Sequence, residues 1–172
     1  MTFALTSLIP DVMEAIRSHL REGTESLTGL DDIEFLVRQG TGDNDPGVTA
    51  PPAVIFPDDK DPGVPIVRVT MESIVPPEGN FEEGDEILID WVVIIDCLAA
   101  TKTGSRTAGV SADSAEGRLA SATFALLIPG SGYRALEERG IERAKPRIDG
   151  LISRDRVFRY PIRLEFQTVA TV

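Results

Sequence analysis

The sequence predicts an α+β fold: a mostly antiparallel sheet with a long central hairpin and two helices packed on one face. Two helical segments are separated by several strands without regular alternation, an order typical of α+β domains. Residues 66–75 and 86–99 alternate in polarity on either side of a turn rich in proline and glycine, which predicts an antiparallel hairpin. The length of 172 residues suits one domain spanning 1–172.

The first helix is predicted over Leu8–Arg21. Val12, Ile16 and Leu20 recur at every fourth position and form one apolar stripe along it. Gly23 follows the last residue of the stripe and is expected to end the helix. The helix should therefore cover the sheet with this stripe.

The next elements are predicted strands, recognised by apolar residues at alternate positions. They span residues 33–38, 53–56, 66–75 and 86–99. The strand at 86–99 is apolar on both faces, so we expect it in the centre of the sheet. Trp91 and Cys97 share one of its faces and are assigned to the core, where a thiol lacks the basic, accessible setting that makes it reactive.

The second half of the chain contains a predicted alanine-rich helix over 112–127, able to lie close to whatever it covers. A short helix at 133–139 and a short strand at 147–151 are expected next. Residues 157–169 alternate clearly and predict a final strand. Because Pro161 has no N–H, this strand is expected at a sheet edge, or with its N–H side open at that point.

Composition narrows the possible functions. Seventeen basic residues against twenty-eight acidic ones give a net charge of −11, which argues against the phosphate contacts that nucleic-acid binding requires. One cysteine excludes an internal disulfide and a cysteine-based zinc cluster. We expect no signal peptide, no membrane span and a reducing cytoplasmic compartment.

The catalytic candidates are few. The one histidine, His19, could act as a general base, but no serine, cysteine or aspartate partner is recognisable. We therefore expect a solvated side chain that is favoured by the negative end of the helix dipole. No phosphate-binding loop or nucleophile elbow is present in the sequence. The sequence predicts neither an enzyme nor a cofactor.

Acidic loops offer one alternative function. Five aspartates could supply the carboxylate oxygens that calcium prefers: Asp43, Asp45, Asp58, Asp59 and Asp61. Their spacing matches no EF-hand, so solvated loops are the expected structure, with a calcium or small-ligand module as the alternative. At the predicted hairpin turn, mutual repulsion among acids such as Glu82 and Glu83 is expected to keep the chain extended.

The basic residues are concentrated in one place, near the C-terminus. They are Arg154, Arg156, Arg159 and Arg163. These arginines are either solvated strand residues or an acceptor surface for acidic loops of an identical neighbouring subunit. In the second interpretation both sets of residues lie at a subunit interface: the four arginines together with Asp58, Asp59, Asp61, Glu82 and Glu83.

The whole layout resembles the tail terminator (tail completion) proteins of long-tailed bacteriophages. The resemblance lies in the N-terminal amphipathic helix, the long hairpin, the alanine-rich helix at 111–128 and the arginine-rich strand at 156–169. It implies a structural virion protein that forms a ring of six subunits on the end of the tail tube, stops tube growth and presents a docking surface for the head connector.

The partners that the resemblance implies are other copies of the chain, the tail-tube protein and the head-connector or neck protein, with DNA passing through the lumen without specific binding. Localisation would be the virion, after assembly in the host cytoplasm. A closed ring requires two different complementary patches on each subunit, which the acidic loops and the arginines would supply. A neck or tail-to-head joining protein is the alternative within the same structural class.

Overall fold

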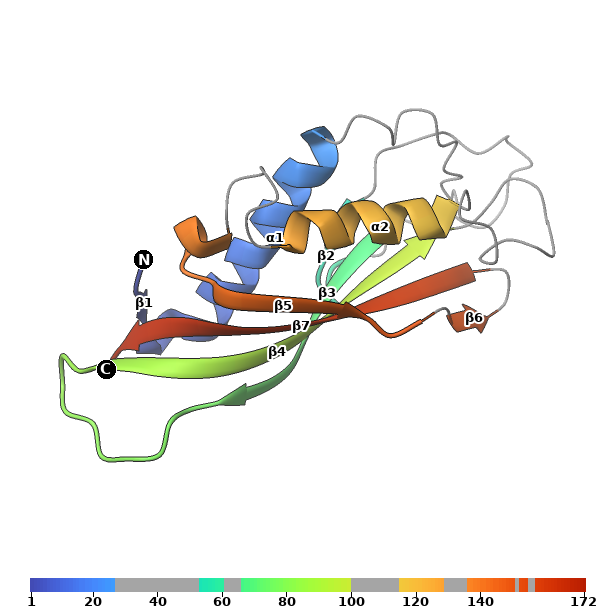
Figure 1. The fold of residues 1–172 in the computed structure, drawn as a ribbon. Coiled ribbons are helices and arrows are strands. Elements are labelled where there is room, and N and C mark those ends of the chain that lie inside the picture. The colour runs from blue at the N-terminus through green and yellow to red at the C-terminus, as the bar shows by residue number, and fades with distance from the viewer. Residues whose placement is uncertain (27–52, 61–65, 100–114, 129–135, 151, 155–156) are drawn as a thin grey trace.

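The computed structural model describes residues 1–26, 53–60, 66–99, 115–128, 136–150, 152–154 and 157–172 (Figure 1). Seven strands form one mixed sheet with the order β1-β7-β4-β3-β2, and β5 and β6 also pair with β7. The strands are β1 (Phe3–Ala4), β2 (Ala53–Ile55), β3 (Ile66–Val75), β4 (Glu86–Ala99), β5 (Glu142–Ile148), β6 (Ile152–Arg154) and β7 (Val157–Thr171). The α+β class is confirmed.

The predicted hairpin is present with the expected strand bounds. Strands β3 and β4 pair in antiparallel register from Ile66↔Leu98 to Val75↔Asp90, with one irregularity between Met71 and Ser73. The other side of β4 pairs with β7 along its whole length. The central position of β4 is therefore also confirmed. Its apolar residues lie in a strand that has a neighbour on each edge, β3 and β7.

Helices α1 (Leu8–Ser26) and α2 (Ala115–Leu127) lie on the same face of the sheet, as Figure 1 shows. A three-residue 3₁₀ turn, Leu5–Ser7, precedes α1. The prediction that Gly23 ends the first helix is wrong. A Cβ atom at Gly23 would lie 2.5 Å from the Cδ atoms of Leu126, so glycine allows the two helices to approach closely. At this position glycine therefore serves helix packing and does not end the helix.

Strand β7 is the second central strand, so its expected place at an edge is wrong. It pairs with β4 on one side and with β1, β5 and β6 on the other. Pro161 is nevertheless accommodated in the second way expected. Its carbonyl accepts a hydrogen bond from Asp149 N on the β5–β6 side, and the N and C=O of one strand residue point to the same side. The missing N–H therefore faces the turn between β5 and β6.

The region before β7 differs most from the predictions. Of the short helix expected at 133–139, the structure shows a 3₁₀ turn, η2 (Leu136–Arg139). The short strand expected at 147–151 is wrong: β5 begins earlier, at Glu142, and the chain turns at Asp149 and Gly150 before β6. Residues 129–135, the predicted strand 33–38 and the predicted first turn of α2 lie outside the described residues.

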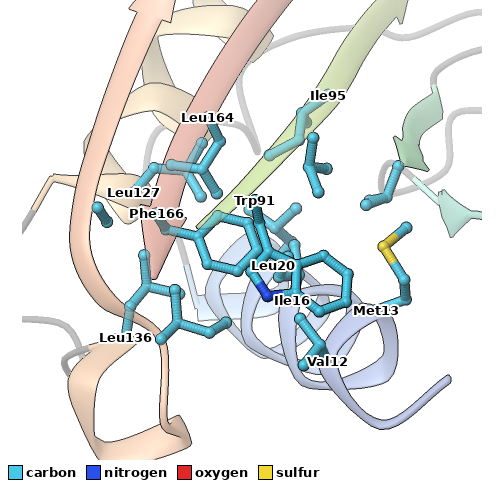
Figure 2. Packing of buried hydrophobic residues seen from close by; sticks show 14 of the residues in the cluster. Val12, Met13, Ile16, Leu20, Trp91, Ile95, Leu127, Leu136, Leu164 and Phe166 are labelled. Carbon is cyan, nitrogen blue, oxygen red and sulfur yellow. The ribbon is translucent and has the colours of Figure 1, made fainter. Parts of the chain in front are cut away.

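The core lies between the helices and the sheet (Figure 2). Alternate residues of β4 point into it, and Trp91 is only 1% exposed. The Trp91 ring stacks on Phe166 of β7, with 5.8 Å between ring centroids, and its Nε1 donates to Thr168 Oγ1 at 2.8 Å. Cys97 is fully buried, and burial raises the pKa of its thiol to about 12. The predicted core role of both residues is confirmed.

Candidate interaction surface

The sheet has a second face that no described helix covers; we call it the open face, and the opposite one the covered face. Register places the even-numbered residues of β4 beside the odd-numbered residues of β7 on this face. Asp90, Val92 and Ile94 are exposed or half-buried there, whereas their neighbours Trp91, Val93 and Ile95 are buried. The alternation of β4 thus gives the sheet one dry face and one face available to a partner.

Charged side chains on the open face pair across neighbouring strands. Arg159 Nε donates to Asp96 Oδ1 at 2.6 Å, and Asp96 is buried. Arg163 donates to Glu72 Oε2 at 2.5 Å and to Glu165 Oε1 at 3.2 Å. These contacts place cations and carboxylates from three adjacent strands in register. The charges of Arg159 and Arg163 are therefore largely compensated within the chain.

The predicted basic cluster is thus only partly available to a neighbour. Two of its arginines, Arg159 and Arg163, lie in β7 and are engaged as described. The backbone of Arg154 ends β6, and Arg156 lies outside the described residues. Sequence could place these arginines on one strand, but it could not show that carboxylates of β3 and β4 would stand opposite them.

The acidic residues of the β2–β3 connection do not form a metal site in the described part of the chain. Asp59 accepts hydrogen bonds from Phe56 N at 2.8 Å and Arg17 Nη1 at 3.3 Å. Asp58 is exposed, and Asp61, Asp43 and Asp45 lie outside the described residues. No group of three or more His, Cys, Asp or Glu side chains that could hold a metal is found among the residues the structure describes.

The turn between β3 and β4, residues 76–85, projects from the sheet as a separate arm (Figure 1); we call it the hairpin tip. It carries four carboxylates and no basic residue, and Glu82 and Glu83 are both exposed. Phe81 is 39% exposed between these acids and Gly79. The tip is anchored at its base, where Gly84 N donates to Val172 O and Val172 N donates to Asp85 O, each at 3.0 Å.

Two cations whose side chains have no partner among the described residues lie on β5, a strand that sequence reasoning missed. Arg143 and Lys145 are exposed, and neither side chain forms a hydrogen bond or ion pair with any residue the structure describes. Arg143 has a φ of 52°, in the left-handed region, at an irregularity in the pairing of β5 with β7. Such strain requires support from the surrounding structure. Charged residues at alternate positions of Glu142–Ile148 could have indicated this strand. The segment is so polar, however, that its composition is also typical of a loop.

These two cations border a hollow on the open face. It has a volume of about 240 Å³ and is lined by residues of β4, β5 and β7, among them Asp90, Val92, Arg143, Lys145, Glu165 and Gln167. Gln167 Nε2 donates to Asp90 Oδ1 at 2.7 Å, but Gln167 Oε1 is buried without a donor among the described residues. The hollow therefore combines two cations, two carboxylates and the half-buried Val92.

His19 was predicted to be solvated, and this is wrong. It is 4% exposed at the contact between α1 and α2, where Nε2 donates to Leu126 O at 2.7 Å. Desolvation is the main cause that lowers the pKa of His19 below its usual 6.5. The carbonyl partner gives this histidine a structural role between the two helices. Its spacing of three residues from Ile16 and seven from Val12 was the signal that it faces the interior.

Comparison with known proteins adds no relative: neither protein-family models nor curated protein sequences match the chain. Within the described residues, no helix is long and apolar enough to cross a membrane. Three surface features bear on function: the open sheet face, the acidic hairpin tip, and the hollow that Arg143 and Lys145 border.

Proposed function

We propose that this chain is a structural virion protein of the tail-terminator kind, which assembles head to tail into a ring at the end of a bacteriophage tail tube. The observation that carries the proposal is that two different edges of the sheet carry different charges. The hairpin tip projects from the end at which β3 and β4 are joined, and β5, with Arg143 and Lys145, lies along the side beyond β7. Heterologous contacts between two different patches generate a ring when the rotation between subunits closes, and an open filament when it does not.

The charges on these edges support the same proposal. The tip carries only acids, whereas Arg143 and Lys145 are free of partners among the described residues. Complementary potentials of this kind steer association and fix its register. The net charge of −11 fits a lumen that lets DNA pass without binding it.

The test is assembly of the purified chain, alone and on tubes. In electron micrographs and by mass photometry we expect rings, with six subunits as the expected number. Added to polymerising tail-tube protein, the chain should produce shorter tubes that carry a ring at one end. A tube protein incubated with bovine serum albumin at equal mass is the control.

Two other results would change the proposal. Rings that bind a head-connector protein and leave tube length unaltered would move the chain to the neck, as a tail-to-head joining protein. A chain that stays monomeric at all concentrations and in the presence of tubes would overturn the ring altogether.

A further inference from the structure

We infer that the hairpin tip of one copy docks into the open-face hollow of the next, with the Phe81 ring inserted beside Val92 and the flanking glutamates paired with Arg143 and Lys145. This inference rests on the proposed self-assembly and names the contact that would produce it. It also shifts the acceptor surface from the arginines of β7 to the cations of β5.

The first argument is the availability of charge. Arg159 and Arg163 already have carboxylate partners within 3.2 Å, so a neighbour's acids would have to compete with them. Arg143 and Lys145 have no such partner among the described residues. A free cation gains more from an incoming carboxylate than one that is already paired, because no existing ion pair must be broken.

The second argument is shape and apolar content. A cavity of about 150 Å³ is known to hold a benzene molecule, and the hollow has about 240 Å³. It is therefore large enough for a phenylalanine ring. Val92 supplies an apolar wall, and the Arg143 guanidinium can lie over an aromatic face. Phe81 is the exposed aromatic residue of the tip, 39% accessible, and aromatic anchors dominate the energy of many interfaces.

The third argument is hydrogen bonding. Gln167 Oε1 is a buried acceptor with no donor among the described residues, although its Nε2 is fixed by Asp90. A buried acceptor left without a donor costs free energy. Because this atom has almost no accessible surface, the Gln167 side chain must rotate before a donor of an entering tip, such as the Asn80 amide, can reach it. The hollow thus offers an apolar wall and two cations, beside the carboxylates of Asp90 and Glu165, to a segment that carries an aromatic ring and acids.

The fourth argument is topology. The tip leaves the sheet between β3 and β4, whereas the cationic wall of the hollow belongs to β5 on the far side of β7. No residue of the tip lines the hollow of its own copy, and the base of the tip is held at Val172. A neighbouring copy placed edge to edge can bring its tip to this hollow, and repetition of this contact is head to tail.

The experiment measures ring dissociation by mass photometry over a dilution series. Arg143→Glu/Lys145→Glu and, separately, Glu82→Lys/Glu83→Lys should each raise the concentration at which half the rings dissociate by roughly tenfold or more. The same weakening is expected for Phe81→Ser. Combining both charge-reversed pairs in one chain should restore assembly, because the complementarity is then inverted. All of these side chains are exposed, so unchanged melting temperatures will show that each variant folds.

Matched controls come from exposed charges away from the contact. Lys60→Glu reverses a lysine at the β2–β3 connection and Glu138→Lys reverses an exposed acid of η2, and neither should weaken the rings. Rings that persist unchanged in the β5 and tip variants would overturn this contact but leave the proposed ring intact. A wild-type chain that never assembles would overturn both. Equal weakening by Glu138→Lys would show a general charge effect and would also overturn the contact.

Discussion

The two faces of the sheet are built from the same strands but differ in burial and charge. On the covered face, successive odd residues of β4 are buried and meet the even residues of β7. On the open face, the intervening positions carry Asp90, Asp96 and Arg163, together with half-buried aliphatic side chains such as Val92. Stability comes from the apolar burial on one face, which leaves the other face available for charge pairing and partner contact.

The comparison separates residues that stabilise the fold from residues that determine what a partner would contact. Cross-strand ion pairs on an exposed face contribute little net stability, because both ions are well solvated without each other. Their arrangement does determine which charges a partner meets. Arg163 is engaged twice, whereas Lys145 on the neighbouring strand is free of partners in the described part of the chain.

The largest expected effect comes from two neighbouring isoleucines on opposite faces of β4. Ile95→Ala removes a fully buried side chain and should lower the free energy of unfolding by about 2–5 kcal/mol. Ile94→Ala removes the same atoms from the half-buried open face and should cost less than about 1.5 kcal/mol. Urea denaturation of both variants checks the comparison. Equal losses would show that the open face is covered as well.

A smaller effect is expected at the ion pair between β4 and β7. Asp96→Ala leaves Arg159 without its carboxylate, but the Arg159 side chain is 41% exposed, so its guanidinium can be hydrated. We expect a loss of roughly 1 kcal/mol in the free energy of unfolding. Glu165→Ala is the control, because Arg163 keeps Glu72, and it should change stability by less than about 0.5 kcal/mol.

The smallest expected effect is a dependence of the free energy of unfolding on pH. It is caused by His19, which is buried between α1 and α2 on the covered face. Because the folded-state pKa of His19 is lowered, the unfolded chain binds more protons below pH 6.5. The stability due to neutral His19 is therefore present above that pH and is lost as pH falls below it, down to the folded pKa. His19→Gln can still donate to Leu126 O but does not titrate.

The measurement is the melting temperature of both proteins between pH 7 and pH 5, a range above the usual pKa values of most carboxyl groups. The wild type should lose stability relative to His19→Gln as the pH falls. Parallel curves for the two proteins would show that His19 is equally protonated in both states and would contradict the burial argument.

Much of the fold could be predicted from sequence because its long elements carry clean periodicity. The bounds of β3 and β4, the start of α1 and the end of α2 all agree with the spacing of apolar residues. The failures have a common cause: tertiary contacts. Gly23 continues a helix because Leu126 lies against it, and β5 exists because β7 supplies hydrogen bonds to a segment that reads as a polar loop.

The candidate site was less predictable than the fold. Sequence located the charged residues of β7 and of the hairpin tip, but charge availability depends on strand register. The pairing of Ile94 with both Thr70 and Arg163 aligns three strands, and this alignment brings Glu72 to Arg163. No local pattern encodes such a neighbour. The same is true of the hollow, whose walls come from β4, β5 and β7.

The short strand β1 has a consequence for how the molecule reaches its native state. Phe3 aligns with Ala170 in parallel, and the adjoining backbone leaves no space at Gly140, where a Cβ would lie 2.9 Å from Met1 O. Closing so long a loop adds only a modest entropic cost, yet contacts between such remote residues slow the conformational search. Residues near positions 3 and 170 must meet before β1 can pair with β7. The topology therefore favours slow, late formation of this pairing.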